Sequence, residues 1–165
     1  MDLSSFKRLV LAHYRSMYRV AYAILRDSDD SQDAVQDAVT RLWEKRHELT
    51  DISDHEAFCI TAVKRRCIDM LRQRQRTMEE MPTSLEHLED GTDTAQAIES
   101  RDTLARVNEL MDALPEQQRE VLRLRSWGGC SVQEIAEITG LSCDNARKVL
   151  SRARQKLKEL YNRKK

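Results

Sequence analysis

The sequence predicts an all-α protein in which a flexible acidic linker joins two small helical domains. Glycine and proline together make up six of the 165 residues, too few for the turns of an all-β fold. Apolar residues recur at spacings of three and four along most of the chain, as they do on one face of an α-helix. Charge is segregated: residues 1–76 have a net charge of +2, residues 77–100 of −7 and residues 101–165 of +5. Two basic blocks around an acidic one indicate two domains and a connecting segment.

Hydropathy argues against insertion into a membrane. No apolar run approaches the roughly 20 residues that a membrane-spanning helix needs. Charged residues occur within the first eight positions, and no signal-peptide core follows them. We therefore expect a cytoplasmic protein.

The four cysteines, Cys59, Cys67, Cys130 and Cys143, do not indicate a metal site. They form no C-x-x-C pair, and no histidine stands at zinc-finger spacing from them. We expect them to be small apolar residues of the core, and we expect no metal and no cofactor.

Two amphipathic helices are expected at the start of the chain. The first runs from about Leu3 to Arg26 and ends in the turn-and-cap cluster of residues 27–30. The second runs from Ser31 to about His47. Its expected buried side consists of Val35, Ala38, Val39, Leu42 and Trp43.

A polar face of the second helix carries Asp33, Gln36 and Asp37. Residues at these spacings are neighbours on a helix surface. Acidic residues in a first turn often do no more than complement the helix dipole. The face is therefore a candidate binding surface only if other parts of the sequence support one.

A basic segment follows the loop at residues 50–54, with Ser53 and Glu56 at capping-box spacing. Its expected inward residues are Phe58, Ile60, Thr61, Val63, Ile68, Met70 and Leu71. Its six basic residues are Lys64, Arg65, Arg66, Arg72, Arg74 and Arg76. Such a cluster is either a solvated helix end, favoured by the helix dipole, or a contact surface for nucleic acid.

The second domain is expected to begin with a helix over residues 101–113. Leu114-Pro115-Glu116 then starts another helix with proline in its first turn, and Trp127-Gly128-Gly129 ends it. Residues 77–100 between the two domains are acidic and polar, which is typical of a flexible linker.

A helix-turn-helix is expected near the C-terminus. Ser131 and Glu134 have capping-box spacing, Gly140 occupies the turn, and a second helix begins at about Asp144. The outer face of that helix carries Arg147, Lys148, Ser151, Arg152 and Gln155. Residues 140–165 have a net charge of +7, so the second helix could enter a DNA major groove, although a helical hairpin with a solvated basic face would show the same pattern.

Leu114 to Leu160 resembles region four of bacterial sigma factors of the extracytoplasmic-function (ECF) type, in the sigma-70 family. The match includes the leucine-proline-glutamate start and the ending Ser-Arg-Ala-Arg-Gln-Lys-Leu at residues 151–157. By this resemblance, the residues that would read a minus-thirty-five element are Asn145, Arg147, Lys148, Ser151 and Arg152.

A second block in the first domain resembles region two of the same family. The family pattern D-x-x-D-x-x-Q-[ED]-x-x-x-x-x-W is matched in register by Asp33, Gln36, Asp37 and Trp43. The resemblance implies that these residues dock on the clamp helices of core RNA polymerase. It covers residues 5–76 and 101–160 in total.

The basic segment resembles the part of region two that melts the promoter and reads the minus-ten element. The resemblance assigns this role to Lys64, Arg65, Arg66, Arg72, Arg74 and Arg76. Arg65 stands where the family commonly has asparagine, and a guanidinium lacks the mixed donor and acceptor edge of an amide. The base that this position captures is therefore left open.

The sequence thus predicts a two-domain sigma factor and not an enzyme. Implied partners are core RNA polymerase, through its clamp helices and flap, promoter DNA and an anti-sigma factor; no small-molecule substrate is expected. The resemblance implies a nucleoid-associated protein whose linker imitates nucleic acid in the polymerase channel, with a plain tether as the alternative. The alternative function is a stand-alone helix-turn-helix regulator, which would have no use for a clamp-docking face.

Overall fold

The computed structural model describes residues 1–80 and 101–163, and all of its regular structure there is α-helical. The chain divides into two compact units, Met1–Gly91 and Thr92–Lys165. The predicted all-α fold is confirmed. Most of the predicted linker, residues 81–100, lies outside the described residues.

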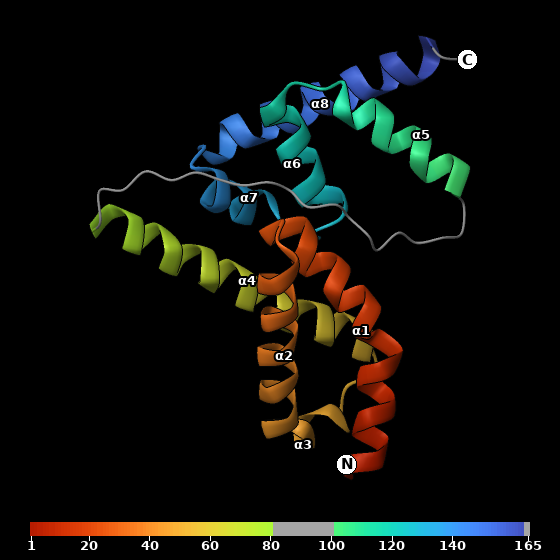
Figure 1. Ribbon diagram of the computed structural model, residues 1–165, viewed down its shortest axis with the longest axis vertical. Helices are drawn as coiled ribbons and strands as arrows, with labels where there is room; N and C mark the ends of the chain where they lie inside the picture. Colours follow the sequence, from red (N-terminus) through yellow and green to blue (C-terminus); the bar gives the residue numbers. More distant parts are fainter. Residues whose placement is uncertain (81–100, 164–165) are drawn as a thin grey trace. The chain divides into compact units, whose positions relative to one another are not determined.

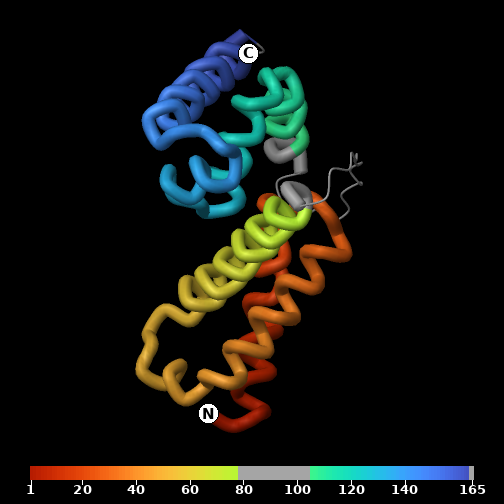
Figure 2. The backbone as a smooth tube through the Cα atoms, turned by 90° about the vertical axis from the view of Figure 1, so that its left-hand side faces the viewer, coloured from red at the N-terminus to blue at the C-terminus, as the bar shows by residue number. Residues whose placement is uncertain are grey.

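Three long helices form the first unit: α1 (Leu3–Leu25), α2 (Ser28–Glu44) and α4 (His55–Glu80), joined by the single-turn α3 (Arg46–Leu49). Each long helix packs against the other two, and Figures 1 and 2 show α4 alongside α1 and α2. Their apolar stripes form one core. Its most deeply buried members are Met17, Ala21, Ala34, Val35, Leu49, Cys59, Val63 and Cys67.

The corner between α1 and α2 differs from the expectation. Arg26 ends α1 in the left-handed conformation, with φ of 56°, and the side chain of Asp27 accepts a hydrogen bond from the backbone N–H of Asp30. Asp27 is therefore the N-cap, and α2 begins at Ser28, three residues before the expected start. Asp29 and Asp30 then lie in the first turn, where the helix dipole favours acidic residues.

The N-cap of α4 lies one residue later than the predicted Ser53. The Asp54 carboxylate accepts a hydrogen bond from the N–H of Ala57 at 3.0 Å, so Asp54 and not Ser53 caps the helix. Cys59, Val63 and Cys67 form its innermost line, four residues apart. The expected inward residues Phe58, Ile60, Thr61, Met70 and Leu71 are only half-buried. The helix extends to Glu80, past the expected domain boundary at residue 76.

The second unit consists of α5 (Arg101–Asp112), α6 (Glu116–Ser126), α7 (Val132–Thr139) and α8 (Cys143–Arg163), with α8 packed against the other three. Its core includes Leu110, Leu114, Val121, Leu124, Cys130, Ile135, Ala146, Leu150 and Ala153. Pro115 has an extended ψ of 150°, so it precedes the first turn of α6 instead of lying in it, as was expected.

Local signals build the predicted helix-turn-helix of α7 and α8. Ser131 and Glu134 form both hydrogen bonds of the capping box, at 3.1 and 2.8 Å. Gly140 ends α7 with φ of 82°, and the Ser142 hydroxyl accepts a hydrogen bond from the N–H of Asn145 at the start of α8. The predicted corner at Gly140 is confirmed.

Three of the four cysteines are fully buried: Cys59, Cys67 and Cys130. Burial, with a smaller effect of the Glu56 carboxylate, raises the pKa of the Cys59 thiol to about 11. Cys143, at the start of α8, is half-buried. Within the described part of the chain, no three His, Cys, Asp or Glu residues are grouped to hold a metal ion.

The described helices are not suited by their length and composition to cross a membrane. None of them combines the necessary length with sufficient apolar character.

Replacing Gly140 with alanine should destabilise the second unit by about 1 kcal/mol, because a Cβ is strained at a φ of 82°. Gly140→Asn should cost less, since asparagine tolerates this conformation better. Amide hydrogen exchange in α7 and α8 measures the loss of stability in each variant. Equal protection in the alanine variant and the parent would contradict the strained corner.

The cysteines should differ in reactivity according to burial. In the native protein at pH 8, Cys143 should react first with a maleimide, and Cys59 should react only on unfolding, because its thiol is buried and protonated. Mass spectrometry of peptides after timed labelling distinguishes the sites. Labelling of Cys59 as fast as Cys143 would show that α4 does not shield it.

Candidate functional site

The acidic face of α2 is exposed to solvent. Asp33, Gln36 and Asp37 all project from it, as their spacing predicts. Trp43, two turns further along, is half-buried: its ring packs edge-on against Phe6, with centroids 5.0 Å apart, and lies under the Arg46 guanidinium. Trp43 therefore joins α1 to α2, and it is less accessible to a partner than the three polar residues are.

Two ion pairs connect the acidic residues of α2 to the basic residues of α4. Arg66 Nε lies 2.9 Å from Asp37 Oδ2, and Arg74 pairs with Asp30. The sequence assigns Asp37 to a polymerase surface and Arg66 and Arg74 to a DNA surface. The structure brings residues of the two predicted surfaces into contact.

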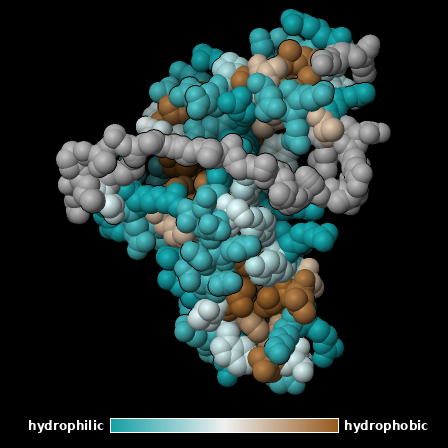
Figure 3. Space-filling view, viewed as in Figure 1, coloured by the Kyte–Doolittle hydropathy of each residue, from teal (hydrophilic) through white to brown (hydrophobic). Residues whose placement is uncertain are grey.

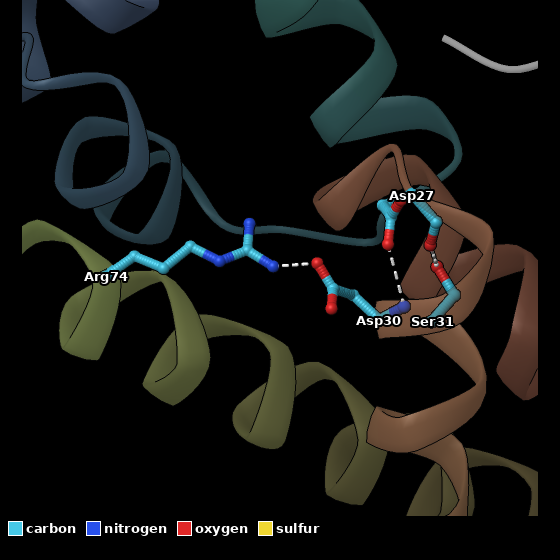
Figure 4. Close-up of polar contacts among 4 residues, drawn as sticks. All are labelled: Asp27, Asp30, Ser31 and Arg74. Atoms are coloured by element: carbon cyan, nitrogen blue, oxygen red, sulfur yellow. Dashed lines mark hydrogen bonds and ion pairs between the residues drawn. The ribbon is translucent and has the colours of Figure 1, made fainter. Parts of the chain in front are cut away.

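The Asp30 carboxylate lies among several polar groups at the start of α2 (Figure 4). Burial raises the pKa of Asp30; the Arg74 guanidinium opposes this effect, and the Asp27 carboxylate adds to it. The Ser31 hydroxyl, fully buried, donates a hydrogen bond to the Asp27 carbonyl at 2.6 Å. The Arg74 guanidinium therefore offsets part of the cost of burying the Asp30 carboxylate.

The predicted minus-ten residues divide between two sides of α4. Arg65, Arg72 and Arg76 are exposed, and their spacings of seven and four residues place them on one outward face. Arg72 pairs on that face with Asp69 at 3.0 Å. Lys64 is half-buried, and Arg66 and Arg74 turn towards α2.

All five predicted recognition residues of α8 are exposed: Asn145, Arg147, Lys148, Ser151 and Arg152. They lie on two edges of the helix. Arg147 and Ser151 line an open cavity of about 510 Å³ together with Arg154 and Lys158, whereas the other three do not line it. The Arg147 guanidinium lies 3.0 Å from Asp144, but both side chains are largely exposed and the pair is weak.

Arg125 of α6 lines the same cavity and was not predicted as a functional residue. Its Nη1 donates a hydrogen bond to the carbonyl of Cys130 at 3.0 Å, which ties the end of α6 to the turn before α7. No sequence motif marks it, because its position beside α8 results from packing. Val132 and Leu150 provide the apolar part of the cavity wall.

Over the second unit, the face in view in Figure 3 is mainly hydrophilic. This appearance agrees with the exposed charged residues of α8. On the first unit an apolar area is visible near α1, a helix on which Leu3 and Leu11 are 54% and 75% exposed.

Comparison with known proteins identifies both units. The family model for sigma-70 region 2 matches residues 9–77, and the model for sigma-70 region 4 matches residues 104–157. The chain is 29% identical over 155 residues to a probable RNA polymerase sigma factor, RfaY, of Xanthomonas campestris; the match covers 91% of this chain and 38% of that relative. It is 26% identical over 159 residues to the ECF RNA polymerase sigma factor SigM of Mycobacterium tuberculosis, covering 96% of this chain and 78% of the relative.

A solved structure has a similar fold. It is the sigma factor RpoE in complex with the anti-sigma factor NepR from Bartonella quintana, with a TM-score of 0.58 and 22% identity, covering 97% of this chain and 98% of that one. Helical units that match region 2 and region 4, in this order along one chain, together with the ECF-type relatives, show that the protein belongs to the extracytoplasmic-function type of the sigma-70 family of RNA polymerase sigma factors.

Proposed function

We propose that the protein binds core RNA polymerase, directs it to specific promoters and assists opening of the duplex at the minus-ten element. One observation carries the proposal: an exposed acidic face in the region 2 unit and an exposed basic helix in the region 4 unit occur in a single chain. A stand-alone operator-binding regulator would use only the basic helix. The sigma-factor function accounts for both surfaces.

In this proposal, residues 1–76 form the domain that binds the polymerase and the minus-ten element. Asp33, Gln36 and Asp37 face the clamp helices, and Trp43 supports their helix by packing on Phe6. The outward arginines of α4, Arg65, Arg72 and Arg76, contact the minus-ten strand. Their guanidinium groups suit phosphate binding and stacking on unpaired bases.

The domain of residues 101–165 binds the minus-thirty-five element and the polymerase flap. The first turns of α8 enter the major groove, where an arginine can form a bidentate pair with guanine. Arg125, Arg154 and Lys158 surround the cavity beside α8 and contact phosphate, which adds affinity without sequence preference.

The chemistry of RNA synthesis belongs to the polymerase in this proposal, and the protein acts as a non-enzymatic initiation factor without a cofactor. Its work on chromosomal DNA places it in the cytoplasm, at the nucleoid. The solved RpoE structure of similar fold has an anti-sigma factor bound, and we include a partner of that kind in the proposal.

Reversing a single charge on the docking face tests the polymerase contact. Asp33→Lys should weaken binding of core polymerase about tenfold, which corresponds to about 1.4 kcal/mol of lost complementarity. Asp33 is exposed, so the fold should lose less than about 0.5 kcal/mol. Fluorescence anisotropy of the labelled chain against core polymerase measures the affinity.

The matched control is Asp51→Lys, which reverses another exposed charge, in the loop before α4. It should bind core polymerase like the parent. The docking face is misassigned if Asp33→Lys and Asp51→Lys bind equally well.

Base reading and phosphate contact on α8 should respond differently to mutation. Arg147→Ala or Arg152→Ala should relax the preference at one or two base pairs, each worth about 1–3 kcal/mol of discrimination. Lys158→Ala should weaken binding to all sequences alike and make the salt dependence shallower by roughly one unit of slope. Binding-site selection with the reconstituted holoenzyme at several salt concentrations separates these effects. If the arginine variants instead lose affinity for all sequences and keep the same preferred sequence, Arg147 and Arg152 contact only the DNA backbone and the assignment of base reading is wrong.

A further inference from the structure

The ion pairs between α2 and α4 form a ladder. Asp30 and Asp37 are seven residues apart on α2, and their partners Arg74 and Arg66 are eight apart on α4, in the opposite order. Two antiparallel helices bring such spacings into register about two turns apart. We call these four residues the α2–α4 clasp.

The clasp is partly shielded from solvent. The side chain of Arg66 is 21% exposed, and that of Asp37, its partner, is 49% exposed. Arg74 and Asp30 are 43% and 32% exposed. Arg66 therefore extends little into solvent, in contrast to Arg65 one position earlier, which is exposed on the outward face of α4. Arg74 is exposed, but its guanidinium is directed to Asp30 by their ion pair.

The geometry points to a role for the clasp in promoter binding: Asp37 and Asp30 are positioning residues that hold Arg66 and Arg74, and through them set the rotation of α4 that presents Arg65, Arg72 and Arg76 to the minus-ten strand. This inference rests on the proposed function of the first unit and deepens it. It divides five of the six basic residues of α4 by task, with Arg66 and Arg74 fixing the helix and the three outward arginines contacting nucleic acid; half-buried Lys64 is assigned to neither group.

The direction in which DNA affinity changes when a clasp carboxylate is removed distinguishes a positioning role from an incidental place near the DNA. A carboxylate close to a DNA surface repels phosphate, so its removal should raise DNA affinity if it has no other role. If the carboxylate holds the helix, its removal should lower DNA affinity. A positioning pair should also be coupled, so that losing both partners costs no more than losing one.

The experiment uses holoenzyme assembled at saturating core polymerase, and measures its affinity for a fork-junction DNA with a single-stranded minus-ten segment. Asp37→Asn and Arg66→Gln should each weaken this binding about three- to fivefold, and the double variant no more than either one. The charge-swapped variant, with Asp37→Arg and Arg66→Asp together, should recover most of the affinity. Asp30→Asn, Arg74→Gln and their combination should follow the same pattern.

Asp51→Asn is the matched control, because Asp51 is an exposed carboxylate in the loop before α4 and belongs to neither predicted binding surface. It should leave the fork-junction affinity unchanged once core polymerase is saturating. Circular dichroism melting of every variant checks the fold, and core affinity is titrated separately.

Two results would overturn the inference. One is a rise in DNA affinity for Asp37→Asn. The other is an additive loss in the double variant, with Arg66→Gln alone reducing the salt slope by about one, which would make Arg66 a direct phosphate contact. Failure of the parent chain to bind core polymerase or the fork junction would instead count against the proposed function.

Discussion

The antiparallel packing of α2 on α4 is the constraint on which the first unit depends. The buried residues of these helices, together with those of α1, set how far one helix can slide along the other. A shift of one turn would take Val35 and Val63, which have no exposure to solvent, away from the residues that they pack against. The same register brings Asp37 to Arg66 and Asp30 to Arg74. Apolar burial supplies the free energy that fixes this register, and the ion pairs then restrict the rotation of α4 within it.

In the second unit one helix serves both packing and binding. α8 buries Ala146, Val149, Leu150 and Ala153 on one side against α6 and α7. The opposite side is left to polar and basic residues, since a helix has a surface wide enough for both. The fixed turn at Gly140 and the capping box of α7 limit the angles at which α8 can leave the corner. The basic surface is thus held on a rigid element, as a sequence-reading surface requires.

Charge on this protein is used locally although the whole chain has no formal net charge. Acidic residues of α2 differ in their contacts: Asp33 faces solvent and Asp30 pairs with Arg74, whereas Asp37 lies on the exposed face and also pairs with Arg66. Partly exposed pairs of this kind contribute little to stability, typically up to about 1 kcal/mol. The two ion pairs act instead by orienting α4, because a guanidinium held at one carboxylate restricts the movement of its own side chain and of the helix that carries it.

The sequence by itself determined the features that depend on contacts within a few residues. The helical stripes, the capping box of Ser131 and Glu134, and the turn at Gly140 all follow from local spacing and backbone preference, and the structure contains them. The family also follows from two motifs that each lie in one helix or corner. The starts of two helices were predicted less accurately, because serine and aspartate both cap helices and both occur there; in the structure Asp27 and Asp54 are the caps.

Only the tertiary structure decided which surface residues meet. Arg66 and Asp37 are 29 residues apart and Arg74 and Asp30 are 44 apart, so no local pattern could pair them. The contact of Trp43 with Phe6 and the place of Arg125 in the cavity beside α8 likewise depend on the packing of separate helices. Periodicity shows that a residue lies on the outer face of its helix, but the partner it meets there is set by the register between helices, which the summed burial of the core determines.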